Sequence, residues 1–134
     1  MQELELRNVK LQAGDKLRVE GTVHEDAERF QIDMGTDPED LSLHFNPRFH
    51  DETDGRVIVC NSKCEGSWGS EQRETHNPFH RGAKVKVTVK LMEAGFEVEL
   101  PEGQEIHFPD RRGLEAVTYV RVRGHLNLSC FKIY

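Results

Sequence analysis

Basic residues are fewer than acidic residues in this sequence of 134 residues. It has 18 lysines and arginines and 24 aspartates and glutamates, which give a formal net charge of −6. A chain with this balance has no basic footprint for nucleic acid or for an anionic membrane surface. The first six residues carry neither a cationic start nor an apolar run, so we expect no secretory signal and no membrane span. The sequence therefore predicts synthesis in the cytosol, without nucleic-acid binding or membrane insertion.

Cysteine is also scarce, with three residues at Cys60, Cys64 and Cys130. A small, odd number of cysteines in such a chain predicts reduced thiols rather than a disulfide framework. Cys60 and Cys64 are not followed by a second ligand pair at the spacing of a zinc finger, so we expect neither a metal nor another cofactor.

Helical periodicity is nearly absent, and alternation of apolar and polar residues dominates instead. The segments 84–92 and 96–100 alternate clearly and are joined by Glu93-Ala94-Gly95, which predicts a hairpin whose outer face sets lysines against glutamates. Further strands are expected at 4–9, 17–23, 29–34, 41–48, 56–62, 105–108 and 117–134, the last one broken near Gly124. The one helical candidate is a short turn at 112–116.

Many short strands separated by Gly, Pro and Asp are typical of an all-β sandwich of two antiparallel sheets, with almost no helix. The length fits one domain with a real core, and the sequence has no linker, repeat or low-complexity tract. We therefore expect a single domain that spans residues 1–134.

Alternation divides the segment 41–48 into two faces. The apolar face must meet the core, and its residues are Leu41, Leu43 and Phe45. The polar face carries Ser42, His44, Asn46 and Arg48. Side chains two positions apart on a strand are separated by about 6–7 Å, so an imidazole, an amide and a guanidinium form a row. This row donates and accepts hydrogen bonds, which suits a ligand with many hydroxyl groups.

The next segments add Asn61, Trp68, Glu71 and Arg73, and with His44, Asn46 and Arg48 we call these the motif residues. Trp68 is the single tryptophan and stands among glycines and serines, a poor setting for a core residue. An exposed indole can receive the C–H face of a pyranose, and galactose is the natural candidate because its axial 4-hydroxyl leaves one ring face apolar. Glu71 between Arg48 and Arg73 would form a charge-assisted network that orders these side chains before the ligand arrives. Asp54 is a candidate further acceptor for one arginine.

Alternatives to sugar binding stay open for single residues. The arginines and Glu71 could form a structural ion network, Trp68 could be a packing residue, and a lone histidine on a strand is most often structural. An enzyme is disfavoured, because the sequence has no Gly-x-Ser-x-Gly elbow and a glycosidase needs two carboxylates placed across the scissile bond. Glu71 is better explained as an acceptor held by arginines. We therefore expect a binding protein and not an enzyme.

Taken together, the runs 44–49, 58–62 and 68–74 resemble the signature of the galectins, and the resemblance extends to 78–79, 108–109 and the closing segment 124–132. The length is similar to that of the single-domain, or prototype, class. The resemblance implies a jelly-roll sandwich, similar to that of legume lectins, that binds β-galactosides without metal. It also implies that His44, Asn46 and Arg48 hold the region of the galactose 4-hydroxyl, and that Asn61 and Glu71 hold the 6-hydroxyl. Trp68 would stack on the ring, while Arg48, Glu71 and Arg73 would reach an adjoining glucose or N-acetylglucosamine.

The implied ligands are lactose and N-acetyllactosamine groups on glycoproteins or glycolipids, and the implied location is cytoplasmic and extracellular, by non-classical secretion. The terminal strands carry apolar residues at Leu4, Leu6, Val9, Leu126, Leu128, Phe131 and Ile133. Terminal strands often form sheet edges, where unpaired backbone groups can pair with another chain. We therefore expect a homodimer that cross-links cell-surface glycans.

Two further hypotheses complete the sequence analysis. The runner-up to a lectin is a galectin-fold structural or protein-interaction protein with little sugar binding, and intracellular protein partners beside glycans are also open. Because Cys60 lies between Val59 and Asn61, we expect its oxidation to disturb the site.

Overall fold

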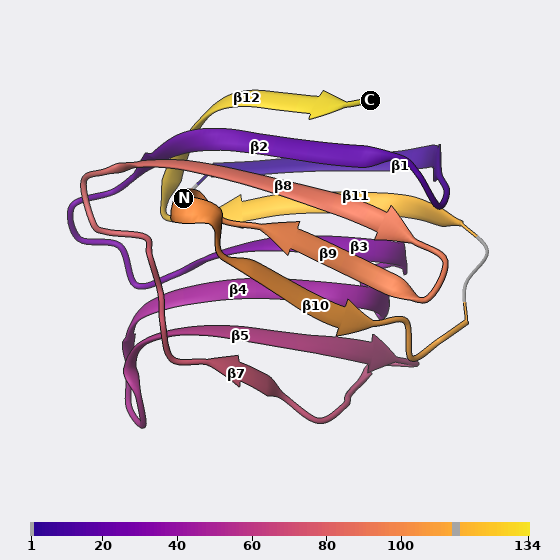
Figure 1. Cartoon of the computed structure of the whole chain (residues 1–134), viewed down its shortest axis with the longest axis horizontal. Coiled ribbons are helices and arrows are strands. Elements are labelled where there is room, and N and C mark those ends of the chain that lie inside the picture. The colour runs from indigo at the N-terminus through magenta and orange to yellow at the C-terminus, as the bar shows by residue number, and fades with distance from the viewer. Residues whose placement is uncertain (1, 114–115) are drawn as a thin grey trace.

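The computed structural model describes residues 2–113 and 116–134, which form two antiparallel β-sheets packed face to face (Figure 1). The strands are β1 (Gln2–Leu11), β2 (Lys16–Val23), β3 (Phe30–Asp37), β4 (Asp40–Asp51), β5 (Gly55–Cys64), β6 (Ser67–Trp68), β7 (Gln72–Glu74), β8 (Lys84–Met92), β9 (Gly95–Glu99), β10 (Glu105–Pro109), β11 (Val117–Gly124) and β12 (Leu126–Ile133). A short 3₁₀ turn, η1, spans Pro101–Gly103.

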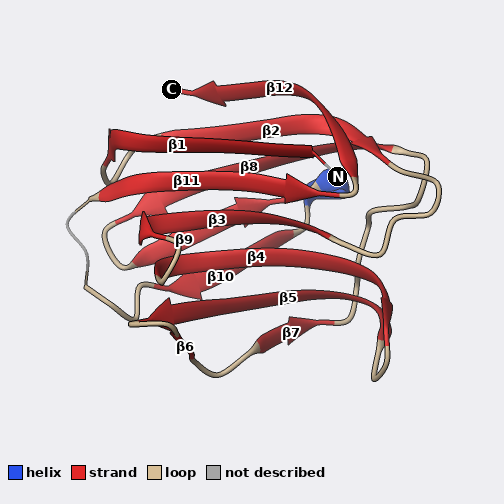
Figure 2. Cartoon of the chain, turned by 180° about the vertical axis from the view of Figure 1, so that it is seen from behind, coloured by secondary structure: helices blue, strands red, loops and turns tan. Residues whose placement is uncertain are grey.

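The larger sheet has seven strands in the order β1-β11-β3-β4-β5-β6, with β7 also paired to β5, and the smaller sheet has five strands in the order β10-β9-β8-β2-β12. Figure 2 shows that β1 and β12, the outer strands of the two sheets, lie along the same edge of the sandwich. The predicted all-β, two-sheet architecture is confirmed. Within the described residues no helix is long and apolar enough to cross a membrane.

The alternation seen in the sequence places one face of each sheet in the core. On β2 and β8, Leu17, Val19, Val87 and Val89 are at most 1% exposed, while the residues between them point away from the core. Burial of each such aliphatic side chain contributes about 1.5–3 kcal/mol. The predicted hairpin is β8–β9, and its outer face pairs lysine with glutamate as expected: Lys90 Nζ lies 2.6 Å from a carboxylate oxygen of Glu99.

Strand β4 departs from strict alternation at its start. The register of β4 shifts against β3 between Gly35 and Met34, and against β5 between Leu41 and His44. As a result Ser42, expected on the polar face, lines a cavity of about 330 Å³ that has walls from both sheets. Leu41 is buried but lies outside the main core cluster. The prediction of the two faces is therefore wrong for Leu41 and Ser42, because a bulge reverses alternation, and right from Leu43 onward.

Other boundaries follow the sequence closely. The long terminal segment is broken at Gly124, where β11 ends and β12 begins two residues later, as predicted. Gly124 has φ +131, and a Cβ there would lie 2.5 Å from the Cα of Phe30, so no larger residue fits without a shift. The predicted helical turn at 112–116 contains Leu114 and Glu115, which lie outside the described residues. Its described members, Arg112, Gly113 and Ala116, are not helical.

Candidate functional site

Strand β4 presents His44, Asn46 and Arg48 on the outer face of the seven-stranded sheet. Asn46 is 1% exposed, donates a hydrogen bond from Nδ2 to the carbonyl oxygen of Phe30 at 2.8 Å, and accepts one from Arg48 Nε at 2.9 Å. Arg48 also donates from Nη1 to Asp51 at 2.9 Å. These bonds leave each side chain in one orientation, so the row is ordered before any ligand arrives.

Asn61 stands beside this row, because β5 pairs Asn61 with His44. Its Nδ2 donates to the carbonyl oxygen of Gly69 at 2.9 Å, and its Oδ1 accepts from Arg111 Nη1 at 3.2 Å. A Cβ at position 69 would lie 3.0 Å from Ser62 Oγ, 3.1 Å from the Arg111 guanidinium and 3.3 Å from Asn61 Oδ1, so a larger residue there would require these side chains to shift slightly. The Gly69 carbonyl and Arg111 therefore orient the Asn61 amide.

Trp68 on β6 is 50% exposed, so this large side chain lies outside the core, as its glycine- and serine-rich sequence context predicted. Its ring centroid lies 4.7 Å from that of His44 at an interplanar angle of 53°, and Lys63 Nζ lies 5.0 Å from the indole centroid. A cation at this distance is attracted to the indole π face. The indole is therefore held in place by neighbours while a large part of it faces solvent.

Glu71 and Arg73 belong to a network of carboxylates and guanidiniums at the end of the row. Arg73 donates to Glu71 at 3.0 Å, to Asp51 at 3.0 Å and to Asp54 at 2.8 Å. The hydrogen bond from Arg73, followed by those from the Asp54 backbone and Arg48, holds the pKa of Asp51 well below its usual range. The hydrogen bond from Arg73 to Asp51 is also the largest of the interactions that raise the pKa of Arg73. Glu71 was predicted to contact two arginines, and it does: Arg73 Nε lies 3.0 Å and Arg48 Nη2 3.9 Å from its carboxylate.

Behind His44 lies a carboxylate that the sequence analysis did not single out. Asp33 on β3 is fully buried, and its Oδ1 is 2.6 Å from His44 Nδ1. Its Oδ2 accepts from Gln31 at 2.6 Å and from Arg121 at 3.0 and 2.8 Å. Burial would raise the pKa of Asp33, but the hydrogen bonds from His44, Gln31 and Arg121 outweigh it and the pKa is lowered. Asp33 therefore stays ionised beneath the site.

These elements enclose an open pocket of about 400 Å³ lined by His44, Arg48, Val59, Asn61, Trp68, Gly69 and Glu71. Five of the motif residues face it directly, Asn46 orients Arg48, and Arg73 orients Glu71. The pocket combines one exposed aromatic face with amide, imidazole, guanidinium and carboxylate groups. Such a surface can bind a polar ring through its apolar face and its hydroxyl groups.

Four important residues escaped the sequence analysis: Asp33, Asp51, Arg111 and Arg121. Asp33, Arg111 and Arg121 act from strands or loops whose pairing with the site is non-local, whereas Asp51 lies three residues after Arg48 on the same strand. Asp33 and Arg121 are paired in register between β3 and β11, although 88 positions separate them. Asp33 alternates with the core residues Ile32 and Met34 and so shares the outer face of the sheet with His44, but the sequence pattern did not reveal this partner. Asp54, by contrast, was predicted as an arginine acceptor and is found as one.

Cys60 lies in the core, where its thiol is poorly reactive. The thiol is 1% exposed and belongs to the core cluster beneath β5. Burial, and secondarily the charge of Glu74, raise the pKa of Cys60 to about 12. Because the thiolate is the reactive form, Cys60 is protected from oxidation in the folded protein, and the effect that its oxidation would have on the site stays a prediction. Cys64, at the end of the same strand, is exposed.

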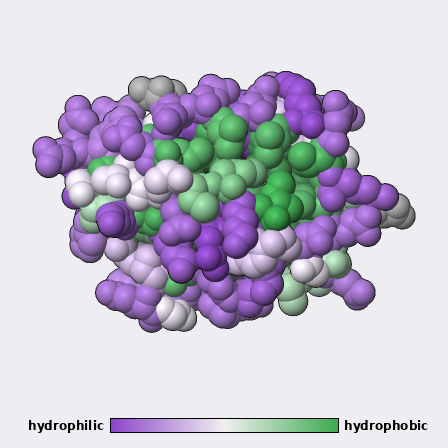
Figure 3. All heavy atoms as spheres, turned by 90° about the horizontal axis from the view of Figure 1, so that it is seen from above, coloured by the Kyte–Doolittle hydropathy of each residue, from purple (hydrophilic) through white to green (hydrophobic). Residues whose placement is uncertain are grey.

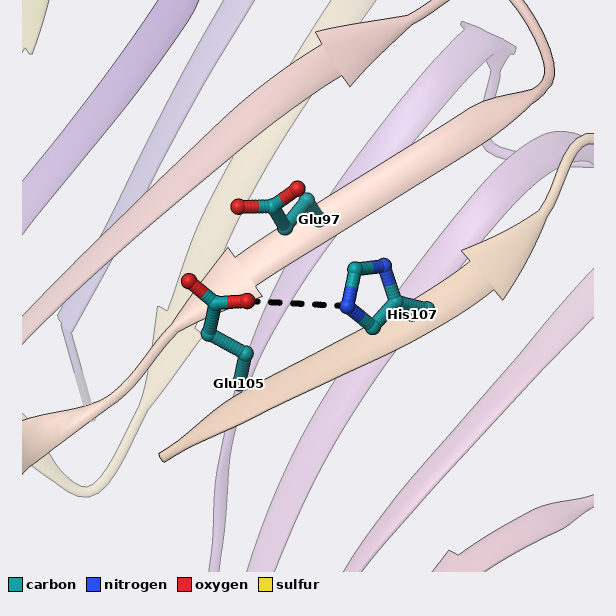
Figure 4. A group of neighbouring side chains, drawn as sticks. All are labelled: Glu97, Glu105 and His107. Carbon is teal, nitrogen blue, oxygen red and sulfur yellow. Dashed lines mark ion pairs between the residues drawn. The ribbon is translucent and has the colours of Figure 1, made fainter. Parts of the chain in front are cut away.

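One further group of side chains has the composition of a metal site. Glu97 on β9 and Glu105 and His107 on β10 bring their ligand atoms within 4.8 Å of one another (Figure 4). The Glu105 and His107 side chains are 44% and 69% exposed, and Lys90 Nζ lies 3.8 Å from Glu97. A lysine next to solvated carboxylates already offsets their charge, and the group lies on the five-stranded sheet, apart from the pocket. We assign it no role in the site.

The fold and pocket together define a β-sandwich protein whose site is built to bind a carbohydrate on the outer face of one sheet. Residues 3–133 match the family model of the galactoside-binding lectins. The chain is 42% identical to human galectin-2 over 131 residues, which are 98% of this chain and 96% of that protein. It also resembles CG-16, a homodimeric agglutinin from chicken liver, with a TM-score of 0.94 and 37% identity over 99% of this chain and 100% of that chain.

Toad ovary galectin, solved as a complex with thio-digalactose, is similar to the same extent, with a TM-score of 0.94 and 30% identity over 100% of this chain and 99% of that one. The chain therefore belongs to the galectin family, in its single-domain prototype class. It is a galactoside-binding lectin, and its family is one of binding proteins rather than enzymes.

Proposed function

We propose that residues 1–134 act as one carbohydrate-recognition domain that binds β-galactosides such as lactose and N-acetyllactosamine without metal. The observation that carries this proposal is the pocket itself, where a half-exposed indole faces a row of fixed hydrogen-bonding side chains. A thio-digalactose complex of a similar chain supports the ligand class.

In the proposed arrangement the motif residues divide the sugar between them. Trp68 stacks on the C–H face of galactose, and His44, Asn46 and Arg48 bind the region of the axial 4-hydroxyl. Asn61 and Glu71 bind the 6-hydroxyl, while Arg48, Glu71 and Arg73 reach the neighbouring sugar. An equatorial 4-hydroxyl would leave these polar groups without their partner, and unpaired polar groups in a site are costly.

A titration with lactose, with cellobiose as the control, tests the proposal. The two disaccharides differ at the 4-position of the non-reducing sugar. We expect saturable binding of lactose, measured by calorimetry or by Trp68 fluorescence, and no response to cellobiose. Folded, reduced protein that binds neither disaccharide would instead favour a structural or protein-interaction role.

We further propose that the chain forms a homodimer through β1 and β12. These strands end the two sheets on the same side. Figure 3 looks onto this side and shows hydrophobic side chains gathered between hydrophilic margins. Leu4, Leu6, Val9, Leu128 and Phe131 are half-buried there, and Ile133 is 38% exposed. The homodimeric state of CG-16 supports the same assembly.

A dimer of this kind would present two sugar sites and cross-link glycoproteins or glycolipids at the cell surface through avidity. We therefore propose both a cytoplasmic and an extracellular pool, with release by a non-classical route. The free thiols of Cys60, Cys64 and Cys130 support synthesis in a reducing compartment. Release that continues when transport through the endoplasmic reticulum is blocked would support this route, and release that stops would contradict it.

A further inference from the structure

A line of paired charges runs across three neighbouring strands beneath the sugar pocket. In the register of the seven-stranded sheet, His44 on β4 is paired with Asp33 on β3, and Asp33 is paired with Arg121 on β11. Asp33 Oδ1 is 2.6 Å from His44 Nδ1, and Arg121 contacts Oδ2 through both Nε and Nη2. The Asp33 side chain has no solvent exposure, and that of Arg121 is 12% exposed.

The hydrogen bond to Asp33 determines which ring nitrogen of a neutral His44 carries the proton. An ionised carboxylate can only accept, so Nδ1 must be the donor. Nε2 then has its lone pair free, and it belongs to a ring that lines the pocket. A neutral His44 in this tautomer can accept a hydrogen bond from a sugar hydroxyl. A protonated His44 cannot, because both of its nitrogens donate.

The charge of Arg121 affects whether His44 is neutral or protonated, because a buried carboxylate strongly stabilises a nearby cation. With Arg121 in place, Asp33 has a full guanidinium as its partner. Without it, the imidazolium form of His44 would be the one cation in contact with Asp33. Arg48 on the same strand, Lys63 on β5 and Glu71 beyond β6 each have a separate carboxylate or guanidinium partner. Arg111 lies behind Asn61, where it donates to Asn61, Ser62 and Ser70, and it is unchanged in every variant compared below.

We propose that Arg121 is a positioning residue that keeps His44 neutral, with Nε2 as an acceptor, and so extends sugar binding to lower pH. The role in sugar binding rests on the proposed function, whereas the effect on His44 protonation does not. Gln31 completes the set of donors around Asp33 but carries no charge, so the proposal assigns the electrostatic part to Arg121 alone.

The test compares the pH dependence of wild type and Arg121→Gln, which retains a donor toward Asp33 and loses the charge. The titration of the His44 ring is followed by NMR in the sugar-free protein, and lactose affinity is measured from pH 5 to 8.5. We expect the midpoint of His44 protonation and the acid decline of lactose affinity to move up together by about one pH unit, which is a roughly tenfold change in the protonation equilibrium. Above pH 8 the affinity should stay within about twofold of wild type.

Three further variants separate charge from packing. Arg121→Lys restores a cation and should return the midpoint to its wild-type position. The double variant Asp33→Asn with Arg121→Gln has neither charge, so His44 gains no stabilising anion and the upward shift should vanish. Arg123→Gln is the matched control, because Arg123 lies on the same face of the same strand but is paired with Gln31 rather than Asp33. It should leave both midpoints unchanged.

The outcomes are distinct. An unchanged His44 midpoint in folded Arg121→Gln, or a shift that persists in the double variant, would overturn the proposal. If wild type binds no lactose at any pH, the proposed function fails, while the NMR midpoints still decide the role of Arg121. If Arg121→Gln does not fold, the comparison of Asp33→Asn with the double variant decides it: the charge of Arg121 should lower the His44 midpoint in Asp33→Asn, and equal midpoints would contradict an electrostatic role.

Discussion

Trp68 and His44 illustrate how the site holds its parts at the scale of single residues. His44 is buried by its neighbours and fixed by Asp33, whereas Trp68 keeps half of its surface in solvent. An exposed indole of this kind costs the free protein little stability and offers its apolar face to a ligand. Trp68 should therefore contribute to binding and not to folding.

Replacing Trp68 with alanine tests this division. We expect lactose affinity to fall by about tenfold or more, which corresponds to about 1.4 kcal/mol, because the stacking face is lost. The free energy of unfolding should change by less than about 0.5 kcal/mol, as is usual at exposed positions. Calorimetry measures the affinity and urea unfolding the stability, and Trp68→Phe should fall between the two proteins. A large loss of stability would identify Trp68 as a packing residue.

The thiols differ in exposure, and reactivity should follow. Cys64 is exposed, whereas burial raises the pKa of Cys60 to about 12. We expect a thiol reagent at pH 8 to modify Cys64 quickly and Cys60 only on unfolding, because the thiolate must form and be reached. Mass spectrometry of peptides after brief labelling measures both sites. Rapid labelling of Cys60 in folded protein would show that the strand opens readily.

At the scale of elements, strand β4 shows how far the sequence could be interpreted. Alternation from Leu43 to Arg48 predicted both the buried face and the polar row, because each residue within a regular strand turns to the opposite side. The bulge before Leu43 was not predictable, since it depends on the register of β4 against β3 and β5. The short strands β6 and β7 were missed for a similar reason: they are stabilised by pairing with β5 rather than by a pattern of their own.

The same limit applies to the site. The motif residues could be predicted because they stand close together in the sequence and carry the galectin pattern. The residues that hold them, such as Asp33 and Arg121, come from strands joined only by sheet topology. Asp51 is the last residue of β4, and its contact with Arg73 depends on the conformation of the β4–β5 turn.

Asp51→Asn tests whether that turn orders the site. The change keeps an oxygen for the backbone amides of Thr53 and Asp54 and removes the charge between Arg48 and Arg73. Each long side chain that must then be ordered on binding costs about 0.5–1.5 kcal/mol, so lactose affinity should fall by roughly three- to tenfold. Asp15→Asn is the matched control, because Asp15 accepts from a backbone amide in another turn. Equal affinities of the two variants would contradict the proposed ordering.

At the scale of the whole molecule, buried and bridging carboxylates couple folding to pH. The pKa of Asp33 and that of Asp51 are both lowered in the folded protein, so the unfolded chain takes up protons first as the pH falls. Their contribution to stability is therefore complete above the ordinary aspartate pKa of about 3.9 and is lost as the pH falls through the folded values. Urea unfolding between pH 7 and 3 should show a stability that declines below about pH 4–5, and the decline should be shallower in Asp51→Asn. A flat profile down to pH 3 would contradict this coupling.

Assembly is the last property of the whole molecule that the sandwich predicts. The outer edges of β1 and β12 are unpaired within the described chain and lie beside half-buried apolar residues. Ile133→Glu should weaken a two-fold dimer, because symmetry places the change twice in the interface. Loss of a buried aliphatic side chain costs about 1.5–3 kcal/mol for each copy, so the dimer Kd should rise by roughly 100-fold or more.

Light scattering at micromolar concentration and agglutination of galactoside-bearing cells measure this effect. The variant should be monomeric and should no longer agglutinate, while its lactose affinity per chain stays that of wild type, because the pocket is formed by β4, β5 and β6 and their loops. Met92→Glu is the matched control, since Met92 is 51% exposed but ends a central strand of the five-stranded sheet. It should remain a dimer and agglutinate normally. A wild-type protein that is monomeric at micromolar concentration would refute assembly through these edges, and agglutination would then need another source of multivalency.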